Sequence, residues 1–519
     1  SEYEIFFQLH SVAIKKGKGP KKLILARDIF GVRSMYYYKT EQALFFASEM
    51  KCFLAIKDFK PKVNLNALYY YLSGGYAPDR DTLLTGVYKV LPAEIVRFEE
   101  GKLDRRKYWT PLAADSGPQD PDYWARALWE NLQNSTREML PPGESAVGIA
   151  LSGGLDSSLI AAAMRHVAGT RQLIGFTLDN ANRNELEMTK QVAKRLDINL
   201  IIVKIDSDIF QEDLQKLQWL YDELIIKFTF IPTYYLVKAA QKHVEFLFTG
   251  DGGDELFMGY RSDYWEDPFI IKSFSKLGFI RKPLLKIGER IVRPIARRST
   301  AEILSLATEF FTRAYASHPD WQYRIASRIF EAYLHEEELH RLFPQSNIPN
   351  ITEEMVKTIN QTAPQNVIEK ISHTLIAGHL QDDLLRLEKS TAATGVKTRS
   401  PLLDPKLLQF ILNIPPGLKY RNKTTKYLIR YMSEKYDLLP NSLIHPKRKI
   451  GLNAPIRRWL NESSSQEYFR KLMKINAPLP PINMAYANGF YPPKTYVQAL
   501  KSWNIAAISL WTKVFMGKE

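Results

Sequence analysis

AVGIALSGGLDSS, residues 146–158, is the stretch that decides the fold of this 519-residue chain. Its first half is apolar and typical of a buried strand, and its second half combines glycines with serine hydroxyls and the carboxylate of Asp156. An apolar helical pattern follows from Leu159, so the stretch predicts a strand, a tight turn and a helix in direct succession. Such a turn points backbone N–H groups and the positive end of the helix dipole at one spot, which favours phosphate.

The polar residues of this turn fit phosphate binding. Gly153 and Gly154 let the chain approach an anion closely, and the hydroxyls of Ser152 and Ser157 supply donors. Asp156 would repel phosphate unless it holds Mg²⁺ against it. The lysine of a GxxxxGK[ST] loop is missing, which excludes a Walker A site. An ordinary tight turn between strand and helix is the alternative interpretation.

A second glycine-rich turn follows an apolar strand in FLFTGDGGDELF, residues 246–257. Its glycines let Asp251 and Asp254 reach the end of the sheet, where they would face the first loop. Two carboxylates opposite a phosphate loop suit Mg²⁺ and pyrophosphate, whereas an ordinary Asp/Gly turn is the alternative. Leu178 ends another apolar strand, where it could hold an adenine or belong to the core.

Apolar segments alternate with helical patterns from about residue 122 onward. These segments are 146–151, 173–178, 199–204 and 245–249. The alternation predicts an α/β fold, a parallel sheet with flanking helices, and the pattern after about residue 255 is mainly helical. The N-terminal region instead contains short strand-like runs at 22–26, 34–38 and 43–47. A polar stretch at 111–121 resembles a linker, so we expect a β-rich domain in 1–115 and a larger domain in 122–519.

Composition narrows the class of protein. A hydrophobic content of 45% and a charged content of 24% are typical of a globular protein, and no apolar run is long enough to span a bilayer. A single cysteine, Cys52, excludes an internal disulfide and fits a cytoplasmic protein; we expect its thiol to be buried and inert.

The net charge of +15 is concentrated in part in the basic segment 276–298. A solvated helical face is one interpretation of this segment, and a docking surface for an acidic partner or a membrane is the other. Patterns typical of RNA-binding modules or zinc sites are missing, so nucleic acid is not favoured as a partner.

The later sequence carries a family resemblance. Its signatures are DLLR at 383–386, GVKTR at 395–399, PLLD at 401–404 and KIGLNAP at 449–455. Together with SGGLDSS and TGDGGDELFMGY, they resemble the ATP-dependent synthetase domain of the asparagine synthetase family. LARD at 25–28, FGVR at 30–33 and FASE at 46–49 resemble the second half of that family's N-terminal glutaminase domain. The first loop alone is similar to that of other ATP pyrophosphatases.

The resemblance implies a sheet of the adenine-nucleotide α-hydrolase type, a helical C-terminal part and specific site residues. The residues implied to line or contact the nucleotide are Ala150, Leu151, Leu178, Thr249 and Gly250. Those implied to hold pyrophosphate are Ser152, Gly153, Gly154, Asp156 and Ser157, with Asp156 and Asp254 on Mg²⁺. Those implied to act near the reacting centre and in the acyl-substrate pocket are Asp251, Asp383, Arg386 and Lys449.

The activity implied is that of an ATP-dependent carbon–nitrogen ligase with ATP and Mg²⁺ as cofactors. A small-molecule or peptide carboxylate would be activated as an acyl-adenylate with release of pyrophosphate. An amine or ammonia would then attack to give an amide and AMP, as in asparagine biosynthesis. The sequence names neither the acyl substrate nor the amine donor, and leaves open whether the chain forms homo-oligomers.

Two departures from the family bear on the substrates. The family's glutaminase domain uses an N-terminal cysteine, whereas this sequence begins at Ser1 and has no counterpart of the first half of that domain, so we expect no glutamine hydrolysis. Lys227 stands where the family commonly has an aspartate. If Lys227 points inward it opposes the ammonium of aspartate; if it faces solvent it changes nothing.

Three hypotheses follow. The first is an amidotransferase of the asparagine synthetase type that uses ammonia. The second is an offshoot that closes an amide within a bound molecule, as lasso-peptide cyclases and β-lactam synthetases do; the missing cysteine, the altered run 224–230 and the basic segment favour it. The third is an inactive relative that serves as a binding partner, and the presence of Asp156, Asp254 and Lys449 argues against it.

Overall fold

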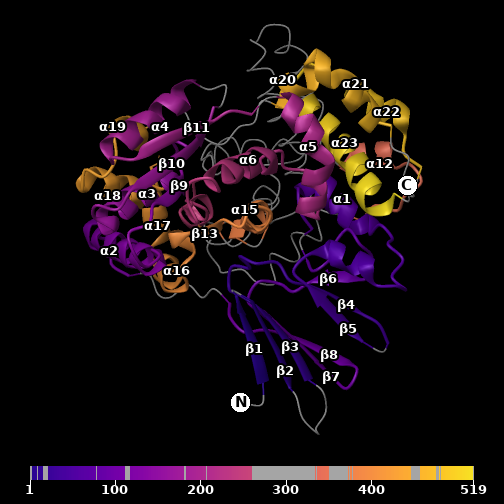
Figure 1. The fold of residues 1–519 in the computed structure, drawn as a ribbon, viewed down its shortest axis with the longest axis horizontal. Helices are drawn as coiled ribbons and strands as arrows, with labels where there is room; N and C mark the ends of the chain where they lie inside the picture. The colour runs from indigo at the N-terminus through magenta and orange to yellow at the C-terminus, as the bar shows by residue number, and fades with distance from the viewer. Residues whose placement is uncertain are drawn as a thin grey trace, which may run out of the picture.

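The computed structural model describes residues 3–259, 334–349, 372–445 and 456–517, with short gaps at 9, 16–21, 42, 78, 111–116, 180–182, 206, 335, 373–374, 377, 423, 475–478 and 480. The chain forms three regions: a central sheet wrapped by helices, an N-terminal β-rich region and a group of helices, most of them from the C-terminal part (Figure 1).

The central sheet has the strand order β11-β10-β9-β12-β13, and all its pairs are parallel. Its strands are β9 (Val147–Ala150), β10 (Leu173–Leu178), β11 (Asn199–Val203), β12 (Phe246–Phe248) and β13 (Lys397–Arg399). The first four confirm the predicted strands. The fifth was not predicted, because a three-residue segment in a mainly helical region has no periodic signal of its own; it becomes a strand by pairing with β12.

Helices cover both faces of this sheet, as the apolar character of β10 requires. On one face, α2 (Pro121–Met139) and α3 (Leu155–Ala168) pack with α16 (Pro405–Leu412) and α18 (Tyr427–Lys435) in one hydrophobic cluster. On the other face, α6 (Phe230–Ala240) and α15 (His379–Ala392) pack over β10 and β12. The remaining elements around the sheet are α4 (Arg183–Arg195), α7 (Gly253–Leu256), η4 (Pro401–Leu403), α17 (Pro416–Lys419), β14 (Tyr420–Arg421), β15 (Thr424–Thr425) and α19 (Asn441–Ile444).

The N-terminal region consists of antiparallel strands in two sheets. One has the order β1-β2-β3-β7-β8, formed by β1 (Tyr3–Gln8), β2 (His10–Lys15), β3 (Lys22–Arg27), β7 (Glu94–Glu99) and β8 (Lys102–Lys107). The other has the order β5-β4-β6, formed by β4 (Tyr36–Lys39), β5 (Leu44–Ala47) and β6 (Val87–Lys89). The predicted strands at 22–26, 34–38 and 43–47 are therefore confirmed, with the second shifted toward Lys39.

One expectation in this region is wrong. Cys52 was predicted to be buried, but its side chain is exposed. It lies on the 3₁₀ helix η1 (Met50–Ala55), whose inward face is formed by Met50 and Phe53. With those two side chains in the core, the helical turn leaves Cys52 on the solvent side.

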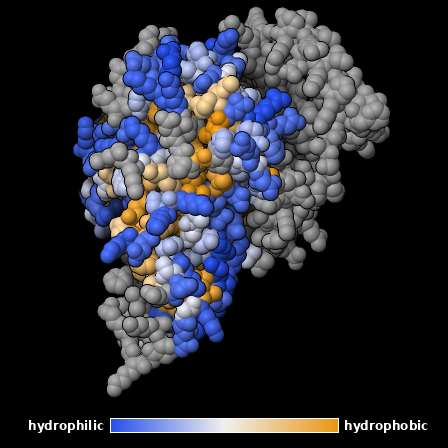
Figure 2. Space-filling view, turned by 90° about the vertical axis from the view of Figure 1, so that its right-hand side faces the viewer, coloured by the Kyte–Doolittle hydropathy of each residue, from blue (hydrophilic) through white to orange (hydrophobic). Residues whose placement is uncertain are grey.

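The third region joins helices that are distant in sequence. It contains α1 (Leu65–Gly74), α5 (Ser207–Tyr221), α12 (Glu336–Leu342), α20 (Ile456–Asn461), α21 (Ser463–Leu472), α22 (Met484–Asn488) and α23 (Tyr496–Met516), and their buried side chains form one cluster. The fully buried Trp503 and Trp511 of α23 donate their indole N–H groups to the carbonyls of Ile225 and Asp222, at 2.6 and 2.8 Å. Figure 2 shows a band of hydrophobic residues bordered by hydrophilic ones on this side of the molecule.

Within the described residues, no helix has the length and apolarity needed to cross a membrane.

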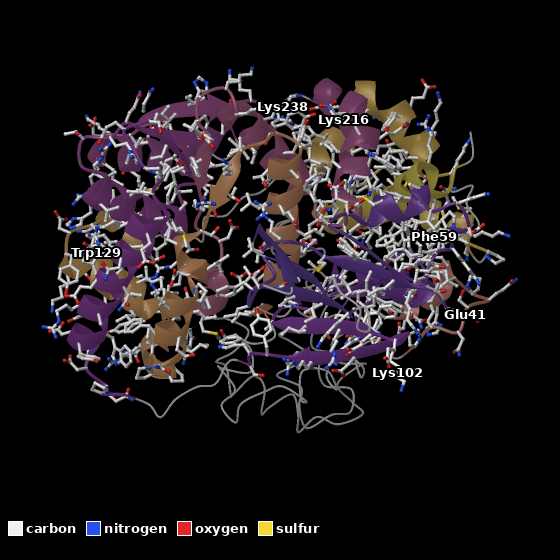
Figure 3. All side chains as sticks on the ribbon, turned by 60° about the horizontal axis from the view of Figure 1, so that its bottom comes forward. Glu41, Phe59, Lys102, Trp129, Lys216 and Lys238 are labelled. Atoms are coloured by element: carbon white, nitrogen blue, oxygen red, sulfur yellow. The ribbon has the colours of Figure 1, made fainter. Side chains whose placement is uncertain are left out.

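Charged side chains lie mostly at the periphery, for example Glu41, Lys102 and Lys216 (Figure 3). One buried charged side chain, that of Glu388, holds the N-terminal region against the sheet domain. The buried carboxylate of Glu388 on α15 accepts hydrogen bonds from the backbone N–H and the hydroxyl of Ser34, at 2.9 and 2.6 Å. These contacts fix α15 between the two regions, with its N-terminal end available for the site.

Candidate active site

Two loops meet at the carboxyl ends of the adjacent strands β9 and β12. The loop after β9 leads into α3, and the loop after β12 leads into α7. Gly250 makes this approach sterically feasible: a Cβ atom there would lie 2.7 Å from the backbone nitrogen of Ser157 and 2.8 Å from the carbonyl carbon of Asp156. The two glycine-rich segments found in the sequence therefore form one site at the sheet edge where α/β proteins bind ligands.

Hydrogen bonds within the first loop fix its shape. The Ser152 N–H donates to the Ser157 hydroxyl at 3.2 Å, and the Gly154 N–H donates to the Ser152 hydroxyl at 3.3 Å. Gly153 has φ of +71°, which favours glycine. Helix α3 begins at Leu155, earlier than the apolar pattern from Leu159 suggested, so Asp156 lies in its first turn. The loop and the N-terminal turn of α3 thus have a fixed geometry that suits an anion, as the sequence predicts.

The residues expected to contact the nucleotide lie around this loop. Thr249 joins the loop after β12 to the end of β13, because its N–H donates to the carbonyl of Arg399 at 2.9 Å and its hydroxyl is 2.8 Å from that of Ser400. Ala150, at the end of β9, is half-buried, whereas Leu151 and Leu178 are buried in the cores on the two faces of the sheet. Their contact with an adenosine stays a prediction.

The centre of the site is a cation held by two carboxylates. The Lys426 ammonium contacts Asp156 Oδ2 and lies 2.6 Å from Asp254 Oδ1, and its side chain is only 6% exposed. Burial alone would lower the pKa of Lys426, but the two carboxylates raise it above its ordinary value, so the ammonium stays charged. Sequence reasoning missed Lys426, because it lies 270 residues from Asp156 and belongs to none of the signatures.

A second group of charges lies at the N-terminal end of α15. The Arg386 guanidinium is 3.4 Å from Asp383 Oδ1 and 3.6 Å from Asp251 Oδ1, and it donates to the Thr233 hydroxyl at 3.1 Å. The structure therefore brings together Asp251, Asp383 and Arg386, which the resemblance implied for the reacting centre and the acyl pocket. Burial raises the pKa of Asp251, and the nearby Arg386 only partly offsets that effect.

His379 completes this group and was also missed. Its Nδ1 lies 3.3 Å from Asp383 Oδ2 and 3.4 Å from Glu255 Oε1. Burial and the nearby Lys227 act to lower the pKa of His379, but the carboxylates outweigh them and raise it to about 9. Burial would raise the pKa of Asp383, yet Arg386 and protonated His379 hold it far below its ordinary range. The pocket therefore contains an anion at Asp383 and a cation at His379 at neutral pH.

Lys227 points inward, which decides between the two alternatives for it. Its side chain is 5% exposed, and its ammonium lies 3.3 Å from Asp382 Oδ2. The Tyr221 hydroxyl donates to the other oxygen of Asp382 at 2.7 Å. Because Lys227 also lowers the pKa of Asp383, its charge acts on the same pocket. The interpretation in which Lys227 faces solvent is wrong.

The donor set can be tested for Mg²⁺. Asp156 and Asp254 come from different loops, yet both place a carboxylate oxygen on one cation, which is the chemistry a hard divalent ion requires. Among the described residues, the ligand-capable atoms of Glu255, His379 and Asp383 also lie within 4.8 Å of one another. Protonated His379 explains that proximity without an ion. The fit is therefore best at Asp156 and Asp254.

Two of the expectations fall outside the described residues. Lys449 and the basic segment 276–298 lie there, so their placement is not part of the site described above.

Two family models match the chain. The one described as "Asparagine synthase" covers residues 127–512, and the one described as "Glutamine amidotransferase domain" covers residues 11–109. The chain is 26% identical over 456 residues to "Asparagine synthetase [glutamine-hydrolyzing] 1" of Bacillus subtilis (strain 168), a match that spans 86% of this chain and 68% of the relative. It is 26% identical over 463 residues to "Putative asparagine synthetase [glutamine-hydrolyzing]" of Mycobacterium bovis, over 86% of this chain and 67% of the relative.

One solved structure with a matching segment is the NH3-dependent NAD synthetase from Campylobacter jejuni. It is 14% identical with a TM-score of 0.21, over 39% of this chain and 98% of that chain, which is too slight a likeness to carry an argument.

Proposed function

The chain belongs to the asparagine synthase family, and from this premise we propose that it is an ATP-dependent ligase that activates a substrate carboxylate and converts it to an amide. The observation that carries the proposal is the placement of Asp156 and Asp254 on a single cation beside the loop 151–154. One sheet edge thus offers anion-binding N–H groups and two carboxylates suited to a divalent cation. We retain 1–115 as a glutaminase-like domain and 122–519 as the synthetase domain; the ranges matched by the family models lie within these bounds.

The proposed reaction begins with attack of the substrate carboxylate on the α-phosphorus of ATP, which gives an acyl-adenylate and pyrophosphate. The N–H groups and hydroxyls of the loop, from Ser152 to Ser157, orient the phosphates and stabilise the charge that develops on pyrophosphate. Lys426 adds positive charge beside this loop, and the family resemblance implies that Lys449 also stabilises charge on the phosphates. Asp156 and Asp254 would hold Mg²⁺, which supplies charge neutralisation for the departing pyrophosphate.

The acyl substrate would lie next to Arg386. Its planar guanidinium can bind a carboxylate through two parallel hydrogen bonds, and it is already positioned by Asp251, Asp383 and Thr233. An amine or ammonia then attacks the acyl-adenylate and releases AMP. Holding both reactants in this half-buried pocket supplies much of the acceleration through proximity and orientation.

The inward position of Lys227 favours a second candidate for the substrate. The buried Lys227 ammonium is paired with Asp382, yet it still lowers the pKa of Asp383, so it adds positive potential to the pocket and disfavours the α-ammonium of aspartate there. The candidate is therefore an offshoot of the family that forms an amide within a bound small molecule or peptide, whose carboxylate need not carry a neighbouring free ammonium. Both candidates share the activation step and differ in acyl substrate and amine.

Release of pyrophosphate from ATP tests the proposal. The full chain is assayed with a panel of carboxylates that includes L-aspartate, each with ammonia, alongside Asp156→Ala and the surface control Asp104→Ala. We expect Asp156→Ala to lower the rate by at least about a hundredfold, the scale seen when transition-state charge loses a stabilising partner, and Asp104→Ala to leave it unchanged. Equal turnover in Asp156→Ala and the unmodified chain contradicts the proposal. Efficient asparagine formation contradicts the second candidate.

A further inference from the structure

Lys426 lies between the loops that follow β9 and β12 and pairs with a carboxylate from each. Its ammonium contacts Asp156 of the loop after β9 and lies 2.6 Å from Asp254 of the loop after β12. The side chains of Asp156 and Asp254 are less buried than that of Lys426, at 18% and 25% exposure. The cation therefore lies beneath the two carboxylates that face the phosphate site.

The backbone around Lys426 is built to hold it there. Lys426 has φ of +54°, in the left-handed region that non-glycine residues seldom adopt, at the N-terminal cap of α18. Its N–H donates to the Phe257 carbonyl at 3.2 Å, and its own carbonyl accepts the first bond of α18 from the Arg430 N–H at 3.0 Å. Gly253 and Gly259 lack the Cβ atoms that would overlap the Asp156 side chain and the Asp254–Lys426 pair, respectively. The backbone conformation of Lys426 is unfavourable for a non-glycine residue, and neighbouring glycines leave room for its ion pairs. Both features indicate that the fold holds the lysine side chain between the two carboxylates.

The charge balance of this centre defines its role. Two adjacent carboxylates repel each other unless a cation lies between them. A lysine supplies one positive charge on a flexible stem, whereas a divalent cation supplies two and binds carboxylate oxygens directly. The same two oxygens cannot hold the ammonium and a divalent cation at once.

We propose that Lys426 is a built-in countercation: it occupies the position of the divalent cation between Asp156 and Asp254 until a cation bound to nucleotide displaces it. This inference rests on the proposed function, in which Asp156 and Asp254 hold Mg²⁺. A cation arriving alone must break both contacts of Lys426 and leaves the ammonium without a partner. A cation arriving with ATP also brings phosphates, and these take over the displaced ammonium.

The consequence is that cation and nucleotide bind together. Each improves the affinity of the other, because the coupling between two ligands is reciprocal. Without ligand, Lys426 keeps the two loops joined and prevents repulsion between Asp156 and Asp254. The lysine thus links the resting state of the site to its loaded state.

Binding of Mn²⁺, used in place of Mg²⁺, tests the proposal. Free Mn²⁺ is measured by electron paramagnetic resonance with the full chain and no nucleotide. We expect Lys426→Met to bind Mn²⁺ roughly ten- to a hundredfold more tightly than the unmodified chain, because the ammonium no longer has to be displaced. The matched control is Lys435→Met: Lys435 lies on the same helix and pairs with the exposed Asp122 at 2.5 Å. The control should bind Mn²⁺ as the unmodified chain does, and the gain should disappear when Asp254→Asn is added to Lys426→Met.

Mn²⁺ affinity in Lys426→Met that is equal to or lower than that of the unmodified chain overturns the proposal. The unmodified chain gives a second test that does not depend on a variant folding: it should bind Mn²⁺ much more tightly with a non-hydrolysable ATP analogue than without it, and equal affinities overturn the inference. A failure of the proposed function looks different, since neither the unmodified chain nor the control would then bind the nucleotide analogue at all.

Discussion

His379 makes the stability of the site depend on pH. The two carboxylates beside it raise its pKa from 6.5 to about 9, and its side chain is 17% exposed. Because the pKa in the folded protein lies above the ordinary value, the stabilisation is fully present below pH 6.5 and is lost as the pH rises through about 9. At 1.36 kcal/mol for each pH unit, the difference between these two values corresponds to about 3 kcal/mol of unfolding free energy.

Urea denaturation at pH 6 and at pH 9.5 measures this contribution. The variant is His379→Gln, which keeps an amide donor toward Asp383 but does not titrate. We expect the unmodified chain to lose about 3 kcal/mol more than the variant between the two pH values, in the transition that includes the central sheet. The control is His445→Gln. His445 and the neighbouring Glu434, 3.6 Å away, are both exposed, so solvent screens their interaction. An identical pH dependence in His379→Gln and the unmodified chain would refute the reasoning.

Two further predictions concern contacts that position the site. Lys389→Met should lower the unfolding free energy by about 1.5–3 kcal/mol in a denaturation experiment, because it removes one of the two ammonium partners of the fully buried Asp222 carboxylate, at 2.9 Å, and leaves only Lys51, at 3.1 Å; a loss below about 1 kcal/mol would contradict this. Gly250→Ala should lower stability by about 1–3 kcal/mol and weaken binding of a fluorescent ATP analogue, because the new Cβ would lie 2.7 Å from the Ser157 backbone nitrogen. Gly417→Ala, where no atom lies within 4 Å, is the control and should change neither measurement.

The parts of the fold that could be predicted are those with local signals. The strand, turn and helix from 146 onward combine an apolar run, glycines and a helical pattern within a few residues, and the structure has them in that order as β9, the loop and α3. The short strand β13 has no such signal, because it is a strand only through its partner β12. Lys426 could not be recognised from the sequence for a similar reason. A lysine before an amphipathic helix is common, and the role of this lysine arises from its contact with Asp156, 270 residues away in the sequence. Lys227 was recognised as unusual, but only packing could show that it points inward.

The charges of the described site share one property that no single motif reveals. Lys426 and Arg386 each contact two carboxylates, and the same is true of His379. The ligand-free site is therefore compensated internally, and any anion that enters must compete with a carboxylate for its cation. On the proposed function, magnesium-bound ATP would meet this condition, because its phosphates would take over Lys426 while its cation took over Asp156 and Asp254. ATP without the cation would leave the two carboxylates facing its phosphates, so the proposal implies that the site selects the metal–nucleotide complex over either component alone.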